Sequence, residues 1–437
     1  MQIAFYSLMP KEDTMIRHYT SVIIALGLAL LFSVTPQLTN AADPIKLGAP
    51  LSTAFLYGWD AERGIKLAVE EINAAGGVDV GGEKRPFSVE VIDTRDLEPG
   101  VPVDDAIKAV EKLILQKEVD FLVGGPVRSE AALAVLDLLN KHKKVSIVTT
   151  GVLSPAYHKT IAENYDKYKY AFRISNEIVN IIVKEMMPVF EKFRADFGLE
   201  RVHIMVQDVA HARKSGEVVD KFLTKAGFTV VSHDIYPTGN TDFAPGLLKS
   251  RRENADVLFI FMDMPETAIL LKQWKSFKLK SLPFGFMSAA EQPDFWEASK
   301  GAAEYAVVDM INGGNAPAEI TPWTMKFVNA YKKMWNKEPE GYGTSSSYMA
   351  VYALKDAIER AGTLESDKVV TALENIDLMG VYGRIRFDKK SHQVIPSTDP
   401  NEGAITGMIQ WQDGKRVTFW PAAGAVGELM LPPWAKE

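Results

Sequence analysis

The residues best placed to do chemistry are Val127, Arg128 and Ser129, which follow a short apolar run and a Gly-Gly-Pro turn. The run, residues 119–123, is rich in β-branched and aromatic side chains and predicts a buried strand. Apolar residues then recur with helical spacing over residues 132–139, so the triplet stands where a helix begins. In an open parallel sheet this point lies at the carboxyl edge of the strands, where free N–H groups and the helix dipole suit a carboxylate. The alternative is an ordinary surface turn with a solvated arginine.

Sequence patterns of catalysis and of metal binding are absent from the chain. It contains no P-loop, HExxH, GxSxG or EF-hand pattern, and its seven histidines do not follow the spacing of metal ligands. The absence of cysteine excludes disulfides, a thiol nucleophile and cysteine metal sites. We therefore expect a protein that is not an enzyme and that needs no cofactor and no metal.

Length and composition indicate a globular protein of two to three domains. The chain has 437 residues, of which 47% are hydrophobic and 24% are charged, as is usual for soluble proteins. The formal net charge is −7 and no long basic block occurs, so nucleic acid is not an expected partner.

The N-terminus predicts a secretory signal peptide over residues 1–42. Positively charged residues precede the almost wholly apolar run 21–34, and cleavage is expected after Ala41 or Ala42. Met15 fits the true start better than the first methionine. The apolar run is short for a membrane span, although an N-terminal anchor is the alternative. A lipoprotein needs a cysteine at the cleavage point and the chain has none, so we expect a free periplasmic protein.

From residue 44 onward, strands and helices alternate in a pattern that predicts two α/β units with doubly wound parallel sheets. The expected strands of the first unit are residues 45–51, 87–92, 119–123, 145–149 and 170–174. Those of the second unit are residues 202–206, 229–233, 257–262, 284–287 and 306–310. Three helices and one further strand are expected at residues 321–335, 347–361, 368–374 and 405–411.

Several motifs resemble one known family. Residues 64–77 read G-x-x-x-A-x-x-x-I-N-A-x-G-G, after the segment K-L-G-A-P-L-S at residues 46–52. Together they resemble the N-terminal signature of the periplasmic leucine/isoleucine/valine-binding proteins, the solute receptors of ABC importers. Other segments that fit are residues 57–58, 123–126, 149–155, 348–360 and 379–388. The resemblance covers residues 44–412, and the tail beyond them is longer than expected for the family.

The resemblance implies a type I periplasmic-binding-protein fold. In this fold two α/β lobes are joined by three crossovers, and a ligand binds between lobes that close by a hinge motion. The second lobe is inserted into the first, with crossovers expected near Ile174, near Gly313 and within residues 383–388. The implied boundaries are 43–174 and 312–383 for the first lobe, and 175–311 and 384–437 for the second lobe with its tail.

The resemblance also implies a ligand pocket with residues from both lobes. The implied ligand-binding residues are Tyr57, Val127, Arg128, Ser129, Gly151, Val152, Leu153, His211, Asp263, Met264 and Glu291. Tyr57 would pack on the ligand, and the two triplets, 127–129 and 151–153, would hold its carboxylate. Glu291, or Ala290 under a one-residue shift, would take its amino group.

Two residues depart from the family pattern. Arg128 stands where a small hydroxyl residue is usual, and Leu153 where threonine is usual. An arginine can clamp a carboxylate in bidentate fashion, and a leucine makes the pocket more apolar, so both changes favour an apolar or aromatic carboxylate. The alternative for Arg128 is an ion pair at the rim with Glu130 or with a carboxylate of the other lobe. Plain loop packing or solvated charge is the alternative for Tyr57, His211, Asp263 and Glu291.

We predict an extracytoplasmic solute-binding protein that closes around a small amino acid or an apolar or aromatic carboxylate. Its partners would be this ligand and an ABC-transporter permease in the inner membrane, and we expect a monomer. One alternative is an extracytoplasmic ligand sensor with the same fold. A second, with less support, is a secreted hydrolase, which would turn its ligand over.

Overall fold

The computed structural model describes residues 42–98, 100–316 and 318–435. The predicted signal peptide, residues 1–42, lies outside these ranges except for its last residue. Residues 43–437 form one compact unit. None of the helices in the described ranges is both long and apolar enough to cross a membrane.

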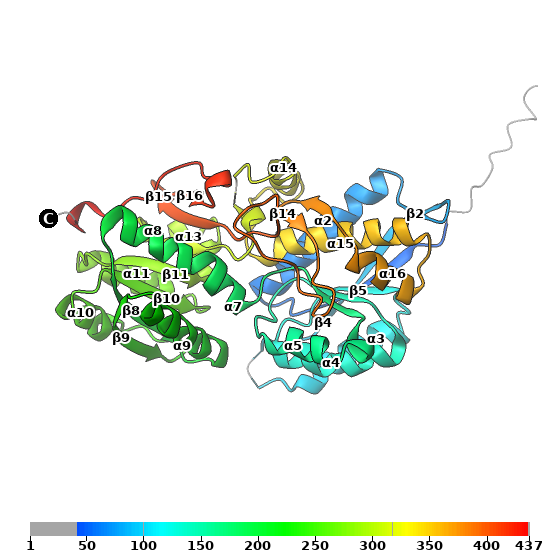
Figure 1. The fold of residues 1–437 in the computed structure, drawn as a ribbon, viewed down its shortest axis with the longest axis horizontal. Helices are drawn as coiled ribbons and strands as arrows, with labels where there is room; N and C mark the ends of the chain where they lie inside the picture. Colours follow the sequence, from blue (N-terminus) through cyan, green and yellow to red (C-terminus); the bar gives the residue numbers. More distant parts are fainter. Residues whose placement is uncertain (1–41, 99, 317, 436–437) are drawn as a thin grey trace, which may run out of the picture. The chain divides into compact units, whose positions relative to one another are not determined.

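The first lobe is built on a five-stranded parallel sheet (Figure 1). In spatial order its strands are β4 (Phe87–Asp93), β1 (Ile45–Leu51), β5 (Phe121–Gly124), β6 (Ser146–Val148) and β7 (Ala171–Arg173). The connecting helices are α2 (Leu56–Ala74), α3 (Val103–Leu115), α4 (Ser129–His142), α5 (Ala156–Glu163) and α6 (Tyr165–Tyr168). Helix α2 packs on one face, and α3, α4 and α5 pack on the other. Coverage of both faces explains why the inner strands β1 and β5 are mostly apolar, whereas the edge strand β4 carries Glu90 and Asp93.

A later part of the chain completes the first lobe. It comprises α14 (Thr324–Trp335), α15 (Gly343–Ala361), α16 (Ser366–Glu374) and the ribbon β13 (Leu378–Gly380) with β14 (Gly383–Ile385); an earlier ribbon pairs β2 (Val78–Val80) with β3 (Glu83–Arg85). Helix α15 lies beside α2 (Figure 1). A Cβ atom on Gly64 would lie 2.2 Å from the carbonyl oxygen of Thr344, so the glycine that begins the family motif allows these two helices to approach closely.

The second lobe is built on a seven-stranded mixed sheet. Its spatial order is β16 (Lys415–Trp420), β15 (Met408–Gln412), β12 (Val307–Asp309), β11 (Leu282–Met287), β10 (Val257–Met262), β8 (Arg201–Gln207) and β9 (Thr229–Tyr236). Strand β15 runs antiparallel to both of its neighbours, β12 and β16, and all other neighbouring pairs are parallel. The helices are α7 (Ile178–Asn180), the π-helix η1 (Ile181–Met186), α8 (Met187–Phe197), α9 (Ala210–Lys225), α10 (Ala244–Arg252), α11 (Thr267–Ser276), α12 (Ser288–Glu291) and α13 (Phe295–Ser299). The predicted doubly wound α/β architecture with two lobes is therefore confirmed.

Three crossovers join the lobes. The first lies between β7 and α7, and the second runs from β12 through η2 (Gly313–Asn315) to α14. The third comes later than the predicted break at 383/384, because Phe387, Val394 and Ala404 still pack in the core of the first lobe. The chain rejoins the second sheet only at β15.

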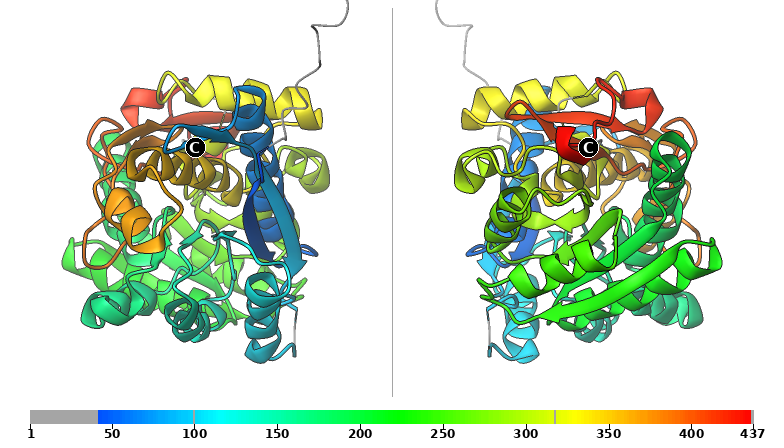
Figure 2. Two further views of the ribbon diagram at one scale, coloured as in Figure 1. Left: turned by 90° about the vertical axis from the view of Figure 1, so that its right-hand side faces the viewer. Right: turned by 90° about the vertical axis from the view of Figure 1, so that its left-hand side faces the viewer.

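The C-terminal tail packs on the second lobe, as the right-hand view of Figure 2 shows. It contains η3 (Ala422–Gly424) and η4 (Pro433–Ala435). The amide of Met430 donates to Oε1 of Gln410 at 2.8 Å, and the indole N–H of Trp434 donates to the carbonyl of Leu279 at 2.9 Å. The tail is therefore part of the lobe, and β16, which the sequence analysis did not predict, forms a hairpin with β15.

Candidate ligand-binding site

All predicted site residues lie just beyond the carboxyl ends of parallel strands. In the first lobe they follow β1, β5 and β6, and in the second lobe they follow β8, β10 and β11. This edge is where open α/β sheets bind ligands. The residues that meet between the lobes are Tyr57, Asp60, Tyr342, His211, Asp263 and Glu291, which we call the interlobe group.

Tyr57 and Asp263 join the two lobes directly. The hydroxyl of Tyr57, on the first turn of α2, donates to Oδ1 of Asp263 at 2.8 Å, and Nε2 of His211 lies 2.6 Å from Oδ2. Burial raises the pKa of Asp263, but the charge and hydrogen bond of His211 outweigh it and hold this pKa below its ordinary value. Burial lowers the pKa of His211, and Asp263 reverses this to give a raised pKa. Asp263 and His211 thus each shift the pKa of the other in the direction that favours the charged form.

Gln207 positions Asp263 and was not predicted. Its Oε1 accepts from the amides of Asp263 at 2.9 Å and of Met264 at 3.1 Å, while its Nε2 donates to Thr238 at 2.8 Å. Gln207 is the last residue of β8 and directly follows an apolar run. A polar residue at that position is the sequence signal that could have identified it. The side chain of Met264 is buried in the second-lobe core, so its amide, held by Gln207, is the part nearest the site.

Tyr342 is a second residue that sequence reasoning missed. Its ring centroid lies 4.8 Å from that of Tyr57 and 6.3 Å from that of Phe286 in the second lobe. Its hydroxyl oxygen accepts a hydrogen bond from the amide of Gly151 at 2.9 Å. Nothing in the local sequence before α15 indicates this role, because the contact joins residues that are far apart in the chain.

The triplet 127–129 differs from its prediction. The amides of Val127 and Arg128 are not free: they donate to Oδ2 of Asp96 at 2.8 and 2.7 Å. Asp96 is 1% exposed, and its other oxygen accepts from the hydroxyl of Thr94 at 2.5 Å. The hydroxyl oxygen of Ser129 accepts from the amide of Ser154 at 3.3 Å. The prediction of free N–H groups at this turn was therefore wrong, because a side chain from the loop after β4 occupies two of them.

The side chain of Arg128 lies at the rim. It is 32% exposed, and its Nε atom is 3.7 Å from Oε2 of Glu130. This is the rim ion pair that the sequence left open as the alternative. Such an exposed pair contributes at most about 1 kcal/mol to stability.

The triplet 151–153 is held tightly against the first lobe. Gly151 has a φ of +61°, and a Cβ atom there would lie 2.0 Å from the carbonyl oxygen of Val127. Val152 is buried in the first-lobe core, and its amide donates to that same carbonyl at 2.8 Å. Leu153 packs with Ile178 at the first crossover. The side chains of Val152 and Leu153 therefore serve packing, and the glycine sets the path of the backbone.

Replacing Gly151 by alanine is expected to destabilise the protein by about 3 kcal/mol, from left-handed backbone strain and the clash with Val127 together. Gly227→Ala is the matched control, because Gly227 has a φ of +84° and no atom within 4 Å of an added Cβ. Chemical denaturation of both variants separates clash from strain. Equal losses of stability would contradict the close contact.

Glu291 is fully buried at the end of α12, and both of its carboxylate oxygens lack a hydrogen-bond partner. Burial raises its pKa well above the ordinary value, and the charges of Asp309, Asp60 and Asp263 raise it further, whereas Arg416 lowers it. The neighbouring Ala290 only offers its carbonyl to the indole of Trp411. Glu291 is therefore a buried acid whose carboxylate is available to bind a cationic group.

Asp60 is a buried acid on α2 that sequence reasoning missed. It is fully buried, with one oxygen unpartnered, and the hydroxyl of Thr344 donates to the other at 3.4 Å. Burial raises the pKa of Asp60 from 3.8 to about 8. Asp309, on β12 in the second lobe, behaves alike: burial raises its pKa to about 7. The region between the lobes is thus rich in acids that lack cationic partners.

Asp60→Asn is expected to flatten the pH dependence of stability. The folded protein keeps a proton on Asp60 that the unfolded chain loses above about pH 4, so the free energy of unfolding falls as the pH rises toward 8. The isosteric amide removes this contribution, and the difference in Tm between mildly acidic and mildly alkaline buffer should shrink. An unchanged difference in scanning calorimetry would contradict the assignment.

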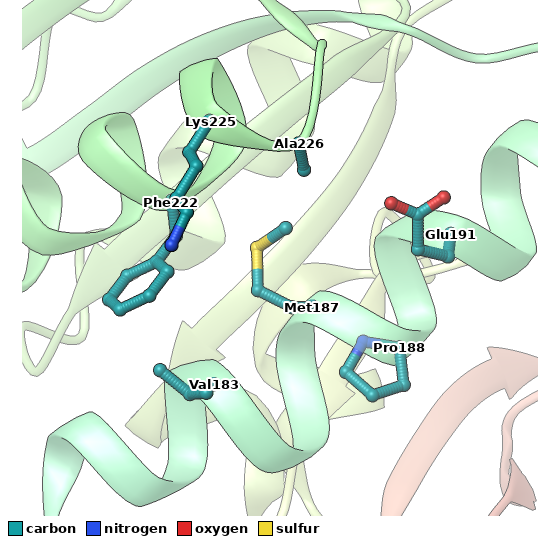
Figure 3. Close-up of a pocket in the computed structure, with 7 residues that line it drawn as sticks. All are labelled: Val183, Met187, Pro188, Glu191, Phe222, Lys225 and Ala226. Atoms are coloured by element: carbon teal, nitrogen blue, oxygen red, sulfur yellow. The ribbon is translucent and has the colours of Figure 1, made fainter.

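One pocket on the described surface lies away from the interlobe group. It has a volume of about 430 Å³ and is lined by η1, α8 and the end of α9, with Met187 between Phe222 and Ala226 (Figure 3). None of the predicted site residues lines it. We therefore place the candidate site between the lobes.

Two doubly wound lobes, three crossovers and polar groups meeting at the facing strand ends define a type I periplasmic-binding-protein fold. The sequence matches the periplasmic binding protein family over residues 47–399, and the chain belongs to this family. The resemblance to the leucine/isoleucine/valine-binding proteins is thereby confirmed.

Relatives and solved structures agree with this assignment. The chain is 27% identical over 424 residues to Leu/Ile/Val-binding protein homolog 7 of Brucella suis, covering 94% of this chain and 99% of the relative. A structure from Silicibacter pomeroyi, described as a branched-chain amino acid ABC transporter, superposes with a TM-score of 0.78 at 19% identity, covering 90% of this chain and all of the other.

Two further structures were solved with ligands. A substrate-binding protein from Streptococcus pneumoniae in complex with isoleucine has a TM-score of 0.68 at 19% identity, covering 89% of this chain and all of the other. A solute-binding protein from Rhodopseudomonas palustris in complex with 3,4-dihydroxybenzoic acid has a TM-score of 0.66 at 18% identity, covering 89% and 99%. At these identities the likeness concerns the fold.

Proposed function

We propose that this protein is an extracytoplasmic receptor that binds a small organic solute between its lobes and delivers it to an ABC importer. The observation that carries the proposal is the direct bond between lobes, from Tyr57 to Asp263 at 2.8 Å, beside the unpartnered carboxylate of Glu291. A ligand that touches both lobes stabilises the closed state, because only that state offers all contacts at once. The closed form would then dock on a permease in the inner membrane.

Export rests on the predicted signal peptide, and the lack of cysteine argues for a free protein in the periplasm. The protein would act as a monomer and leave its ligand chemically unchanged. The sequence predicted an amino acid or an apolar or aromatic carboxylate as ligand. The unpartnered carboxylate of Glu291 favours the ligand class that has an amino group. The ion pair of Arg128 with Glu130 weakens the case for Arg128 as the residue that binds a ligand carboxylate.

A thermal-shift screen tests this proposal. The purified protein, refolded once to remove carried-over ligand, is screened against amino acids, amines, aromatic and aliphatic acids, amides and urea. A ligand that binds only the folded state raises the melting midpoint by mass action. Mass spectrometry should then recover the ligand intact, and uptake of labelled ligand by cells should depend on the gene. Turnover of the ligand, or uptake that persists without the gene, would contradict the proposal.

A further inference from the structure

Two of the three amides in the triplet 127–129, which was predicted to bind a ligand carboxylate, already hold a carboxylate of the protein. Asp96 accepts from the amides of Val127 and Arg128 at 2.8 and 2.7 Å. These are the N–H groups just before α4, where the backbone geometry suits one anion. Asp96 is 1% exposed and is held from its other side by Thr94. A second carboxylate would have to displace it or lie against it.

Two of the three amides in the second predicted segment, residues 151–153, are also bonded within the protein. The amide of Gly151 donates to Tyr342 at 2.9 Å and that of Val152 donates to the carbonyl of Val127 at 2.8 Å. The carbonyl of Gly151 accepts from the buried guanidinium of Arg173 at 2.8 Å. Four of the amides predicted to hold a ligand carboxylate are therefore bonded within the protein.

Three cations near the site lie beside acids, whereas the buried guanidinium of Arg173 has no acid partner among the described residues and donates to the carbonyl of Gly151. Arg128 lies beside Glu130 at the rim, and His211 is paired with Asp263. Arg416 is buried and donates to the carbonyl of Glu291 at 2.7 Å and to the carboxylate of Glu338 at 2.7 Å. His211 and Arg416 are thus held by hydrogen bonds to acids, whereas Arg128 has only a longer ion pair at the rim and no hydrogen bond at its Nε atom.

Buried carboxylates that could bind a cation, by contrast, lack hydrogen-bond partners. Glu291 has two buried oxygens without a bond, and Asp60 has one. Glu291 lies close enough to the aromatic groups of the first lobe to act on them: burial raises the pKa of the Tyr57 and Tyr342 hydroxyls, and the charges of Asp263 and Glu291 raise it further. The unpartnered carboxylate is thus near enough to Tyr57 and Tyr342 to act on their hydroxyls, and the paired rings of these two residues offer apolar and cation–π surface.

From this arrangement we infer that the ligand is a small organic amine that lacks a carboxylate, with its ammonium group on Glu291 and its apolar body against Tyr57 and Tyr342. The inference rests on the proposed function and narrows its ligand. It excludes the amino acids, because their carboxylate would have to displace Asp96 or lie beside Glu291 and Asp60. An ammonium group on Glu291 requires the ionised carboxylate, and a second carboxylate beside an ionised acid costs several kcal/mol.

Two matched sets of probes test the inference. One set is 3-methylbutylamine, leucine and 4-methylpentanoate, and the other is 2-phenylethylamine, phenylalanine and 3-phenylpropionate. Within each set the apolar body stays alike and only the charged groups change. In titration calorimetry each amine should bind at least about 100-fold more tightly than its amino acid, and neither acid should bind.

Variants at Asp96 probe the filled site directly. Asp96→Ala frees the amides of Val127 and Arg128 and should improve leucine or phenylalanine binding while leaving amine binding unchanged. Asp96→Asn is the control, because its amide oxygen still accepts from both N–H groups, so amino-acid binding should improve less. The probe comparison needs only the wild-type protein and stays decisive if a variant fails to fold.

Binding of leucine or phenylalanine as tight as that of its amine would overturn the inference, and so would a failure of both amines to bind. Either result leaves the proposed function standing if another solute raises the melting midpoint and is recovered intact. Chemical turnover of the bound compound would instead contradict the proposed function.

Discussion

Glu291→Gln is expected to weaken binding of a cationic ligand at least 100-fold, whereas the ligand-free protein should fold normally. The carboxylate is fully buried without a partner, so an ammonium group is the group that would compensate it. Removing one member of a buried, hydrogen-bonded charge pair costs about 2–5 kcal/mol, and 1.4 kcal/mol corresponds to about tenfold in affinity. Titration calorimetry with 3-methylbutylamine measures the loss directly.

Glu185→Gln is the matched control for this variant. Glu185 lies on the π-helix η1, is 1% exposed and has both carboxylate oxygens unpartnered, and burial raises its pKa to about 8. It therefore resembles Glu291 in burial but does not belong to the interlobe group. Its replacement should leave affinity unchanged. Equal affinities in the wild-type and Glu291→Gln proteins would show that the ligand does not contact Glu291.

Tyr57→Phe is expected to weaken ligand binding by about 10-fold to 100-fold. The substitution keeps the ring that stacks near Tyr342 and removes only the hydroxyl that donates to Asp263. A hydrogen bond to a charged group contributes about 1.5–3 kcal/mol. Because this bond joins the two lobes, its loss lowers the population of the closed state and the apparent affinity with it.

Tyr352→Phe is the control for the effect of the hydroxyl itself. Tyr352 donates to Glu71 at 2.8 Å, the same length as the Tyr57–Asp263 bond, but Tyr352 and Glu71 both lie in the first lobe. It should lower stability and leave affinity unchanged. Small-angle scattering should show that a saturating ligand closes both variants. If Tyr57→Phe bound as tightly as the wild type, the interlobe bond would not contribute to closure.

Much of the fold could be predicted from the sequence because it depends on local patterns. The strand at residues 257–262 is an unbroken apolar run, and the structure places β10 over the same residues. The expected helix at 321–335 also forms, as α14 over Thr324–Trp335. The third crossover was placed too early, because Val394 and Ala404 follow the apparent end of the lobe yet pack in its core. Such packing leaves no periodic signal in a short loop.

The candidate site was predictable only in part. The carboxyl ends of strands correctly indicated where polar residues would gather, and Tyr57, His211, Asp263 and Glu291 do meet between the lobes. Their roles in binding stay predictions. The occupation of the 127–129 turn by Asp96 could not be predicted, because it joins groups 31 and 32 residues apart through one side-chain rotamer. Tyr342 escaped notice for the same reason, since its partner Gly151 lies 191 residues away.

The most direct measurement is the number of protons exchanged when 3-methylbutylamine binds near neutral pH. Titration calorimetry in buffers of different ionisation enthalpy gives this number. Burial raises the pKa of Glu291 well above the ordinary value, the charges of Asp309, Asp60 and Asp263 raise it further, and Arg416 lowers it. The free site should therefore hold a proton on Glu291, and an incoming ammonium group should expel about one proton, so that affinity rises with pH. No proton release in the wild-type protein, or the same release from Glu291→Gln, would contradict the assignment of Glu291 as the group that holds the ligand.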